Sequence, residues 1–212
     1  MGAFRLVVLA SGGGTNLQAI IDKLHGRDGI EVVGVVSDRP EARALERARS
    51  AGVETGVFAG RDHESRGARD AAIGDWVEAR DADLVVLAGY MQLLSPAFVA
   101  RFRGRVINVH PALLPSFPGL EAVRQALDYG VRVTGVTVHF VDEGVDSGPI
   151  ILQRAVPVPP SREWDELEEA IHATEHELLP EAIRLIAAGR VRQGEGGGRV
   201  VEIDAGTTGG ES

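Results

Sequence analysis

The chain has 212 residues, of which 44% are hydrophobic and 25% charged, as expected for one large globular α/β domain. The net charge of −9, with no basic cluster, argues against nucleic acid or an anionic membrane as a partner. There are no cysteines, which excludes disulfides and thiol catalysis, and no apolar run approaches the ~20 residues of a membrane span. Because residues 1–10 also lack a signal-peptide pattern, we expect a cytoplasmic protein.

The first part of the chain alternates short apolar runs with segments of helical spacing. Buried strands are predicted at 6–10, 32–36, 53–58, 84–88 and 106–109. Helices are predicted to begin near Leu17, at Pro40–Glu41, at Asp70 and after the Ser95–Pro96 N-cap, with 61–69 as a loop. This rhythm predicts an α/β fold with a doubly wound, mostly parallel sheet that begins with a Rossmann-like mononucleotide-binding half. Ligands of such sheets bind beyond the carboxyl ends of the strands, which places the turns at 12–16 and 89–94 and the 108–118 loop on one rim.

The pattern changes after a predicted helix at 120–129. Strands at 134–140 and 150–156, joined by an acidic, glycine-punctuated linker, indicate an antiparallel addition to the sheet. A long helix is predicted at about 163–188, which Pro180 is expected to kink or split. We therefore expect one domain at 1–193 and a flexible, glycine-rich tail at 194–212, with a weak strand at 199–203.

The glycine turn at 12–16 joins a strand to a helix and is a candidate phosphate site. Small residues let backbone N–H groups converge on an anion that the helix dipole also favours. No lysine follows the glycines, and Leu17 stands where a dinucleotide fingerprint has its third glycine, so a single phosphate monoester is favoured over a pyrophosphate. Asp38, about 20 residues on, is placed as a ribose-binding acid would be. The alternative is a tight turn without a ligand.

Two polar side chains leave the end of the strand at 106–109. Asn108 and His110 are two residues apart and point the same way, and Pro111 keeps His110 extended. An amide donor beside a group that titrates near neutrality suits a reaction that develops charge on oxygen. Asp146 is the natural partner, which would orient His110 and raise its pKa. The alternatives are a structural tie for the first two residues and a solvated loop acid for Asp146.

The helical sequence His172-Ala173-Thr174-Glu175-His176 matches the H-x-x-E-H zinc pattern, but no third ligand is evident and the flanking charges favour a solvated helix face over a zinc site. The other three histidines, His25, His63 and His139, form no constellation in the sequence. We expect them to be structural or surface residues.

Three ordered segments resemble the phosphoribosylglycinamide formyltransferases, which are folate-dependent enzymes of purine synthesis. They are Ser11–Ile20 (SGGGTNLQAI), Asn108–Pro115 (NVHPALLP) and Gly135–Ile150, which contains GVTVHF and DSGPI. The resemblance runs from about residue 4 to about residue 193.

The resemblance implies a role for each matching position. The catalytic residues would be Asn108, His110 and Asp146. Those that bind glycinamide ribonucleotide would be Gly12, Gly13, Gly14, Thr15 and Asn16 at its phosphate, Arg66 near it, and Glu175 at the ribose hydroxyls. Those around the pteridine of 10-formyltetrahydrofolate would be Leu87, Met91, Gln92, Leu93, Leu94, Phe98, Val99, Val141 and Asp146. Gln92 departs from an arginine common in the family, and Gly13 from a common asparagine.

The implied reaction is direct formyl transfer from 10-formyltetrahydrofolate to the amine of glycinamide ribonucleotide, without a metal, by a monomer or homodimer. Two alternatives stay open. One is a formyltetrahydrofolate hydrolase or another formyltransferase of the superfamily, such as one acting on methionyl-tRNA, which would need a basic surface. The other is a non-catalytic nucleotide-binding module, for which NAD binding is a simple test.

Overall fold

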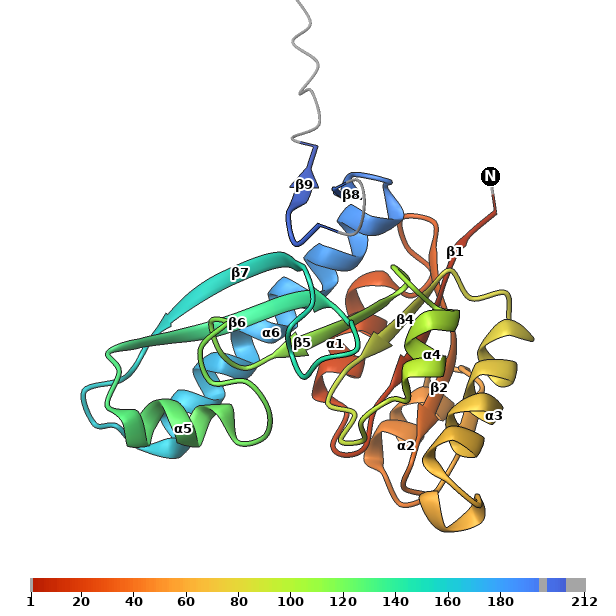
Figure 1. The fold of residues 1–212 in the computed structure, drawn as a ribbon, viewed down its shortest axis with the longest axis horizontal. Helices are drawn as coiled ribbons and strands as arrows, with labels where there is room; N and C mark the ends of the chain where they lie inside the picture. The colour runs from red at the N-terminus through yellow and green to blue at the C-terminus, as the bar shows by residue number, and fades with distance from the viewer. Residues whose placement is uncertain (1, 195–197, 205–212) are drawn as a thin grey trace, which may run out of the picture.

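In a computed structural model, which describes residues 2–194 and 198–204, a seven-stranded sheet of order β3-β2-β1-β4-β5-β6-β7 forms the centre of the molecule (Figure 1). Strands β1 to β5 are parallel, whereas β6 runs antiparallel to both β5 and β7. The predicted fold class is therefore confirmed, including the antiparallel addition. The strands are β1 (Phe4–Leu9), β2 (Ile30–Ser37), β3 (Thr55–Val57), β4 (Leu84–Leu87), β5 (Val106–His110), β6 (Val133–Phe140), β7 (Ile150–Pro157), β8 (Val191–Gln193) and β9 (Val201–Ile203).

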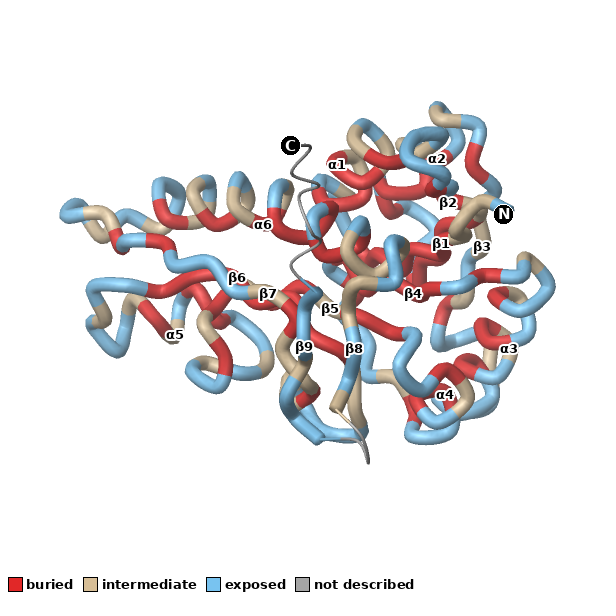
Figure 2. Tube along the Cα trace, turned by 90° about the horizontal axis from the view of Figure 1, so that it is seen from above, coloured by how far each residue is buried: buried red, intermediate tan, exposed pale blue. Residues whose placement is uncertain are grey.

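Helices cover both faces of the sheet (Figures 1 and 2). Successive side chains of a strand point to opposite faces, so Leu6 and Val8 of β1 join one hydrophobic core while Val7 and Leu9 join the other. Helices α1, α2, α5 and α6 contribute to the first core, and α3 and α4 to the second. The helices are α1 (Thr15–Leu24), α2 (Arg43–Ser50), α3 (Arg66–Glu78), α4 (Pro96–Arg101), α5 (Ala122–Tyr129) and α6 (Trp164–Ala187), with a 3₁₀ turn at Gly60–Asp62.

Three helices differ from the sequence prediction. Helix α2 begins at Arg43 instead of Pro40, because the chain first makes a turn in which Ala42 N–H donates to Arg39 O. Helix α3 begins within the segment predicted as a loop, since Ser65 Oγ accepts from Ala68 N–H at 3.1 Å and caps it. Helix α6 runs through Pro180 without a break. Pro180 is buried, and tertiary packing of this kind compensates for the hydrogen bond that a proline removes.

The C-terminal part adds a second, two-stranded sheet in which β8 and β9 pair antiparallel. Strand β9 lies within the predicted weak strand at 199–203. Most of the predicted glycine-rich tail, residues 195–197 and 205–212, lies outside the described residues. Among the residues that are described, no helix is long and apolar enough to cross a membrane.

Candidate active site

The polar cluster of the site forms where the sheet changes from parallel to antiparallel. Asn108 in β5 lies beside Leu87 of β4 on one side and opposite His139 of β6 on the other. Its Nδ2 is 3.3 Å from His139 Nε2 and donates to Asp146 Oδ1 at 3.3 Å. The register of β5 and β6 therefore brings together two residues that are 31 apart in the sequence.

Asp146 collects donors from three parts of the chain. Besides the Asn108 amide, Gly119 N–H donates to its Oδ2 at 2.8 Å, His110 Nδ1 lies 3.3 Å from Oδ2, and His139 Nε2 lies 3.6 Å from Oδ1. Asp146 itself has φ of 49°, a left-handed conformation that aspartate tolerates better than most residues. Its carboxylate is the common partner of the cluster.

The two ring nitrogens of His110 both face oxygen atoms. Nε2 is 2.8 Å from the Phe117 carbonyl oxygen, and Nδ1 faces the Asp146 carboxylate. Only the imidazolium can donate to both, so this geometry favours the charged form. Burial nevertheless lowers the pKa of His110 below its ordinary value, against the raising effect of the Asp146 charge. The expected rise in pKa is thus wrong for the net shift, because desolvation of a nearly fully buried ring outweighs the neighbouring charge.

The carboxylate of Asp146 stays ionised more readily than usual. Burial acts to raise its pKa, but the hydrogen bonds from His139 and Gly119 N–H, together with the charges on His110 and His139, lower the pKa below its ordinary value. The cluster therefore holds a fixed negative charge next to an imidazole that can gain or lose a proton.

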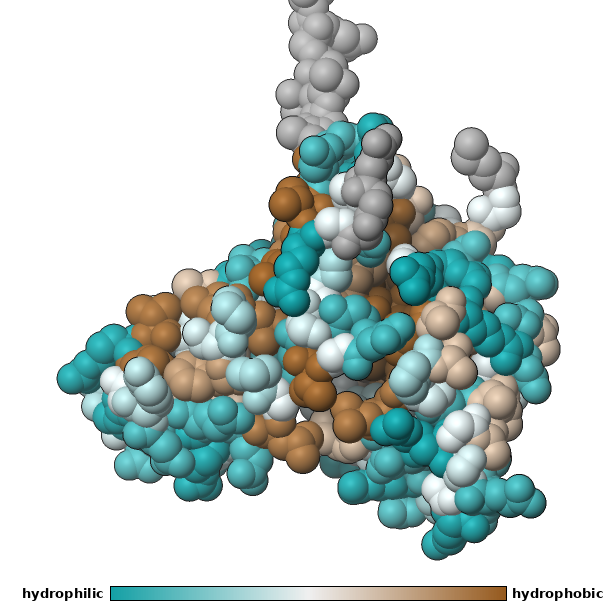
Figure 3. Space-filling model, viewed as in Figure 1, coloured by the Kyte–Doolittle hydropathy of each residue, from teal (hydrophilic) through white to brown (hydrophobic). Residues whose placement is uncertain are grey.

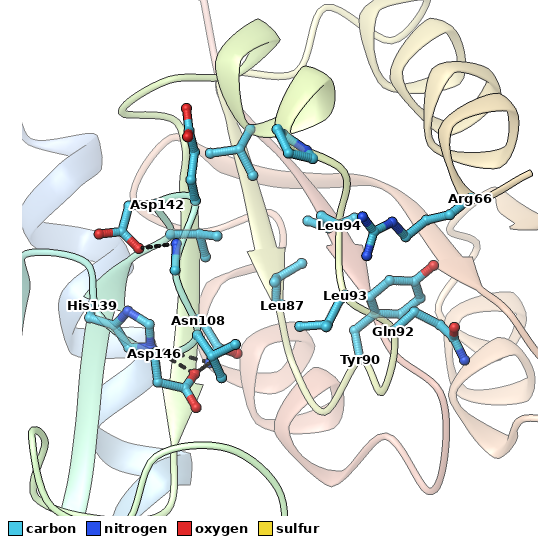
Figure 4. Close-up of a pocket in the computed structure, with 16 residues that line it drawn as sticks. Arg66, Leu87, Tyr90, Gln92, Leu93, Leu94, Asn108, His139, Asp142 and Asp146 are labelled. Atoms are coloured by element: carbon cyan, nitrogen blue, oxygen red, sulfur yellow. Dashed lines mark hydrogen bonds and ion pairs between the residues drawn. The ribbon is translucent and has the colours of Figure 1, made fainter.

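A pocket opens beside this cluster (Figure 4). Asn108, His139, Asp142 and Asp146 lie on one side of it, Arg66 and Gln92 on the other, and Leu87 between them. Hydrophobic side chains also gather in the middle of this face of the molecule (Figure 3). The pocket is lined by Arg66, Leu87, Tyr90, Gln92, Leu93, Leu94, Pro96, Val99, Asn108, His139, Val141, Asp142, Glu143, Gly144, Val145 and Asp146.

Most residues predicted to surround a pteridine line this pocket, with two exceptions. Phe98 is 2% exposed and packs in the core behind the pocket, and Met91 is 53% exposed and faces away from the core. Arg66, predicted near a phosphate, lines the pocket on the same side as Gln92 (Figure 4). The pocket thus gathers Leu87, Gln92, Leu93, Leu94, Val99, Val141 and Asp146 from the predicted set.

The glycine turn lies at the carboxyl end of β1 and leads directly into α1. Gly14 has φ of 69°, and a Cβ at this position would lie 2.7 Å from Ala44 Cα, so only glycine fits. Gly12 and Gly13 are exposed and leave the backbone open to a ligand, and Thr15 is exposed beside them. The turn has the form of an anion cradle at a helix N-terminus.

A carboxylate from the far end of the chain reaches this turn. Asn16 Nδ2 donates to Glu175 Oε2 of α6 at 2.9 Å, and both residues are buried. Burial raises the pKa of Glu175, although the Asn16 amide and His172 act to lower it. Within the described chain, Asn16 Oδ1 is buried and has no hydrogen-bond partner. The glycine turn thus has a buried carboxyl and a buried amide beside it, and the oxygen of that amide is unpaired among the described residues.

The sequence interpretation missed one member of the polar cluster. His139 was expected to be a structural or surface residue; it is 2% exposed, which excludes the surface, and it contacts both Asn108 and Asp146. Because side chains alternate along a strand, the sequence does predict that His139 points to the face opposite that of the core residue Val138. Periodicity does not predict which strand lies beside His139, so its contact with Asn108 could not be predicted. Its Nδ1 lies 2.8 Å from Phe140 O, which fixes the ring.

The two histidines of the zinc-like pattern stack on each other with ring centroids 6.3 Å apart. Across residues 2–194 and 198–204, no group of three His, Cys, Asp or Glu side chains is arranged to hold a metal ion. Nothing in the described residues therefore completes the pattern.

These features define a class: a doubly wound α/β protein with an anion cradle after β1 and an acid–base cluster of amide, imidazole and carboxylate beside a pocket on the same rim. The formyl transferase family model matches residues 4–183 of the chain. The chain therefore belongs to the formyl transferase family.

Several relatives are similar over most of the chain. The structure of glycinamide ribonucleotide transformylase 1 from Symbiobacterium toebii is 51% identical with a TM-score of 0.91, covering 95% of this chain and 94% of that one. The phosphoribosylglycinamide formyltransferase of Mycobacterium tuberculosis is 49% identical over 183 residues, 86% of this chain and 85% of that protein. The trifunctional purine biosynthetic protein adenosine-3 of Bos taurus is 45% identical over 194 residues. The chain spans only 14–19% of such trifunctional proteins.

Proposed function

We propose that the protein transfers the formyl group of 10-formyltetrahydrofolate to the amine of glycinamide ribonucleotide in purine biosynthesis. The observation that carries this proposal is the convergence of Asn108, His110 and Asp146 next to a pocket, in a chain of the formyl transferase family. The relative from Mycobacterium tuberculosis is named phosphoribosylglycinamide formyltransferase, and the match covers 85% of that protein. This supports glycinamide ribonucleotide as the acceptor of the formyl group.

In this proposal the amine nitrogen attacks the formyl carbon and forms a new C–N bond. The carbonyl oxygen becomes an oxyanion, which the Asn108 amide and the protonated His110 stabilise by hydrogen bonds. In the structure His110 Nε2 lies 2.8 Å from the Phe117 carbonyl oxygen, which the oxyanion would replace as its hydrogen-bond partner. Asp146 orients His110 and offsets part of the effect of burial, which lowers the pKa of the imidazole.

The intermediate then breaks the bond between the formyl carbon and N10 of the folate. The amine loses one proton and N10 gains one, so the step is balanced without a metal or an oxidant. Asp146, directly or through a water, is the group placed to carry that proton, because it is ionised and contacts both His110 and Asn108.

The two substrates are assigned to the two ligand-binding features of the rim. The pteridine takes the pocket lined by Leu87, Leu94 and Val141. Arg66, which the resemblance assigns to the phosphate of the ribonucleotide, lines the same pocket. The phosphate takes the glycine turn, and Glu175 accepts from the ribose hydroxyls. Cytoplasmic location and a monomer or homodimer stay predictions.

The test is an assay of the purified protein with 10-formyltetrahydrofolate, with and without glycinamide ribonucleotide. We expect deformylated folate only when the ribonucleotide is present, with an equal amount of formylated product. Equal folate release in both reactions would indicate the hydrolase alternative. Inactivity in both, with retained nucleotide binding, would indicate the non-catalytic module.

A further inference from the structure

A buried ion pair at the start of α3 holds the segment between β4 and α4. Arg69 Nε and Nη2 donate to Asp70 Oδ1 at 2.9 and 2.7 Å, and the two side chains are 4% and 0% exposed. Arg69 also donates from Nη2 to the Leu93 carbonyl oxygen at 3.3 Å, and Asp70 Oδ2 accepts from Ser95 N–H at 2.5 Å. The pair is thus bonded to the backbone at 93 and at 95.

Gln92 connects this pair to a second buried acid. Its Oε1 accepts from Arg69 Nη1 at 3.0 Å, and its Nε2 donates to Asp38 Oδ2 at 3.0 Å. Only an amide meets both demands, because a carboxylate at 92 would repel Asp38 and a cation would repel Arg69. We call the Arg69–Gln92–Asp38 chain of hydrogen bonds the Gln92 bridge.

Asp38 ties the bridge to the rim of the parallel sheet. It follows β2, is 8% exposed, and its Oδ1 has no partner among the described residues. The segment before Gln92 is held as well, since Met91 N–H donates to Ser11 Oγ at 2.8 Å and Ser11 N–H donates to Gly89 O at 3.0 Å. Ser11 begins the glycine turn, so the bridge and this contact join the pocket segment to the anion cradle.

The segment between β4 and α4 that these contacts hold also forms a wall of the pocket. Tyr90, Gln92, Leu93 and Leu94 line it across from Asp146 (Figure 4). Leu93 is 61% exposed, so its side chain is not fixed by packing and depends on the position of its backbone. Gln92 is itself exposed, but both ends of its amide are engaged with protein groups instead of pointing free into the pocket.

We propose that Gln92 is a positioning residue, which through the bridge sets the distance between this pocket wall and the Asn108–Asp146 cluster. It would then act on binding of the formyl donor through the position of the pocket wall, because both ends of its own amide are engaged with Arg69 and Asp38. This inference rests on the proposed function for its kinetic test, but the bridge itself can be tested separately.

The experiment exchanges donor and acceptor within the bridge. In Gln92→Glu the carboxylate still accepts from Arg69 but faces Asp38 without a donor. In the double variant Gln92→Glu with Asp38→Asn, the new amide at 38 can donate to the new carboxylate, and the net charge equals that of the wild type. Gln193→Glu, at an exposed glutamine of β8, is the matched control. We expect all three variants to fold, because Gln92 and Gln193 are exposed and Asp38→Asn keeps the size of the buried side chain.

For the enzyme activity, KM for 10-formyltetrahydrofolate should rise about tenfold in Gln92→Glu with kcat changed less than about threefold, and should return to within about twofold of the wild type in the double variant. An unchanged KM in the single variant overturns the proposal. Failure of the double variant to restore KM also overturns it, since a carboxylate that disturbs the ligand directly is still present there.

Hydrogen exchange of the backbone amides at 90–95 gives a second readout that needs no activity. We expect faster exchange in Gln92→Glu and wild-type exchange in the double variant and in Gln193→Glu. Unchanged exchange at 90–95 in Gln92→Glu overturns the bridge. If the wild-type protein forms no formylated product, the proposed function fails, and the exchange experiment still decides on the bridge.

Discussion

The parallel strands β1–β5 and the antiparallel pair β6–β7 contribute to the site in different ways. The parallel part supplies the anion cradle, with the backbone of the glycine turn and the dipole of α1 acting together over a short stretch of chain. The antiparallel part supplies His139 and, in the loop after β6, Asp146, whose contacts depend on the register with β5. The glycine turn is thus local in sequence, whereas the Asn108–Asp146 cluster forms only when the two parts of the sheet are paired.

The largest effect is expected at that junction. In His110→Ala the oxyanion loses its charged donor, so kcat should fall on the order of 10²–10³-fold, about 3 to 4 kcal/mol of barrier. Steady-state kinetics measures this, and circular dichroism checks that the buried site has not unfolded. Turnover near that of the wild type would contradict the catalytic role of His110.

Asp146→Asn probes the same junction through its charge. We expect kcat/KM to fall by about 100-fold. The Asp146 charge supports the imidazolium, so His110 should lose its proton at lower pH in the variant, and the high-pH limb of the activity profile should move to lower pH. If the high-pH limb of the profile does not move, its position is set by a group other than His110.

The same carboxylate also makes a prediction for stability. The folded-state pKa of Asp146 is lowered, so its contribution to stability is present above the ordinary aspartate pKa and is lost as pH falls through the folded value. Acidification through that range should therefore destabilise the wild type more than Asp146→Asn.

In the parallel part, Gly14→Ala should act on stability and phosphate binding together. The left-handed φ of 69° and the 2.7 Å contact with Ala44 Cα should cost about 2 kcal/mol of unfolding free energy. Thermal unfolding measures this, with Gly13→Ala as the control, since a Cβ there meets no atom of the described chain within 4 Å. Equal melting temperatures for the two variants would show that the turn relaxes.

The smallest effect is expected for Glu175→Gln. Loss of the carboxylate acceptor should raise KM for glycinamide ribonucleotide about tenfold, or 1.4 kcal/mol, with little change in kcat. Because burial raises the pKa of Glu175, its charged form is costly in the folded protein, and the amide should not lower the melting temperature at neutral pH. Any stabilisation should decrease as pH falls below the folded pKa of Glu175 and disappear below the ordinary glutamate pKa, where the side chain is protonated in both the folded and the unfolded states. The exposed Glu169→Gln on the same helix is the control.

The sequence predicted the parallel part better than the junction, for a physical reason. Strand and helix positions follow from local periodicity, and the Ser95 cap is confirmed by the hydrogen bond from Phe98 N–H to its Oγ. The placement of His139 opposite Asn108 depends on a register that periodicity does not encode. The net pKa of His110 depends on burial, which no local pattern reports.

The same limit applies to the Gln92 bridge. Residues 61–69 were expected to form a loop, so Arg69 was not placed on a helix next to Asp70, and no spacing rule links Arg69 to Gln92 or Asp38. The three lie on different segments that only the folded sheet brings together. The roles of the individual site residues stay predictions until the variants are measured.

The bond between Asn16 and Glu175 spans 159 positions of the chain and has a consequence for synthesis of the protein. As the polypeptide leaves the ribosome, its first helix emerges early, but the carboxylate that pairs with that helix arrives only with α6. A nascent chain ending after β7 would already carry Asn108, His110 and Asp146, but it would lack Glu175, the acid beside the anion cradle. Nucleotide affinity should therefore appear only after α6 has packed against α1, later than the Asn108–Asp146 cluster, and it can serve as a marker of that docking step.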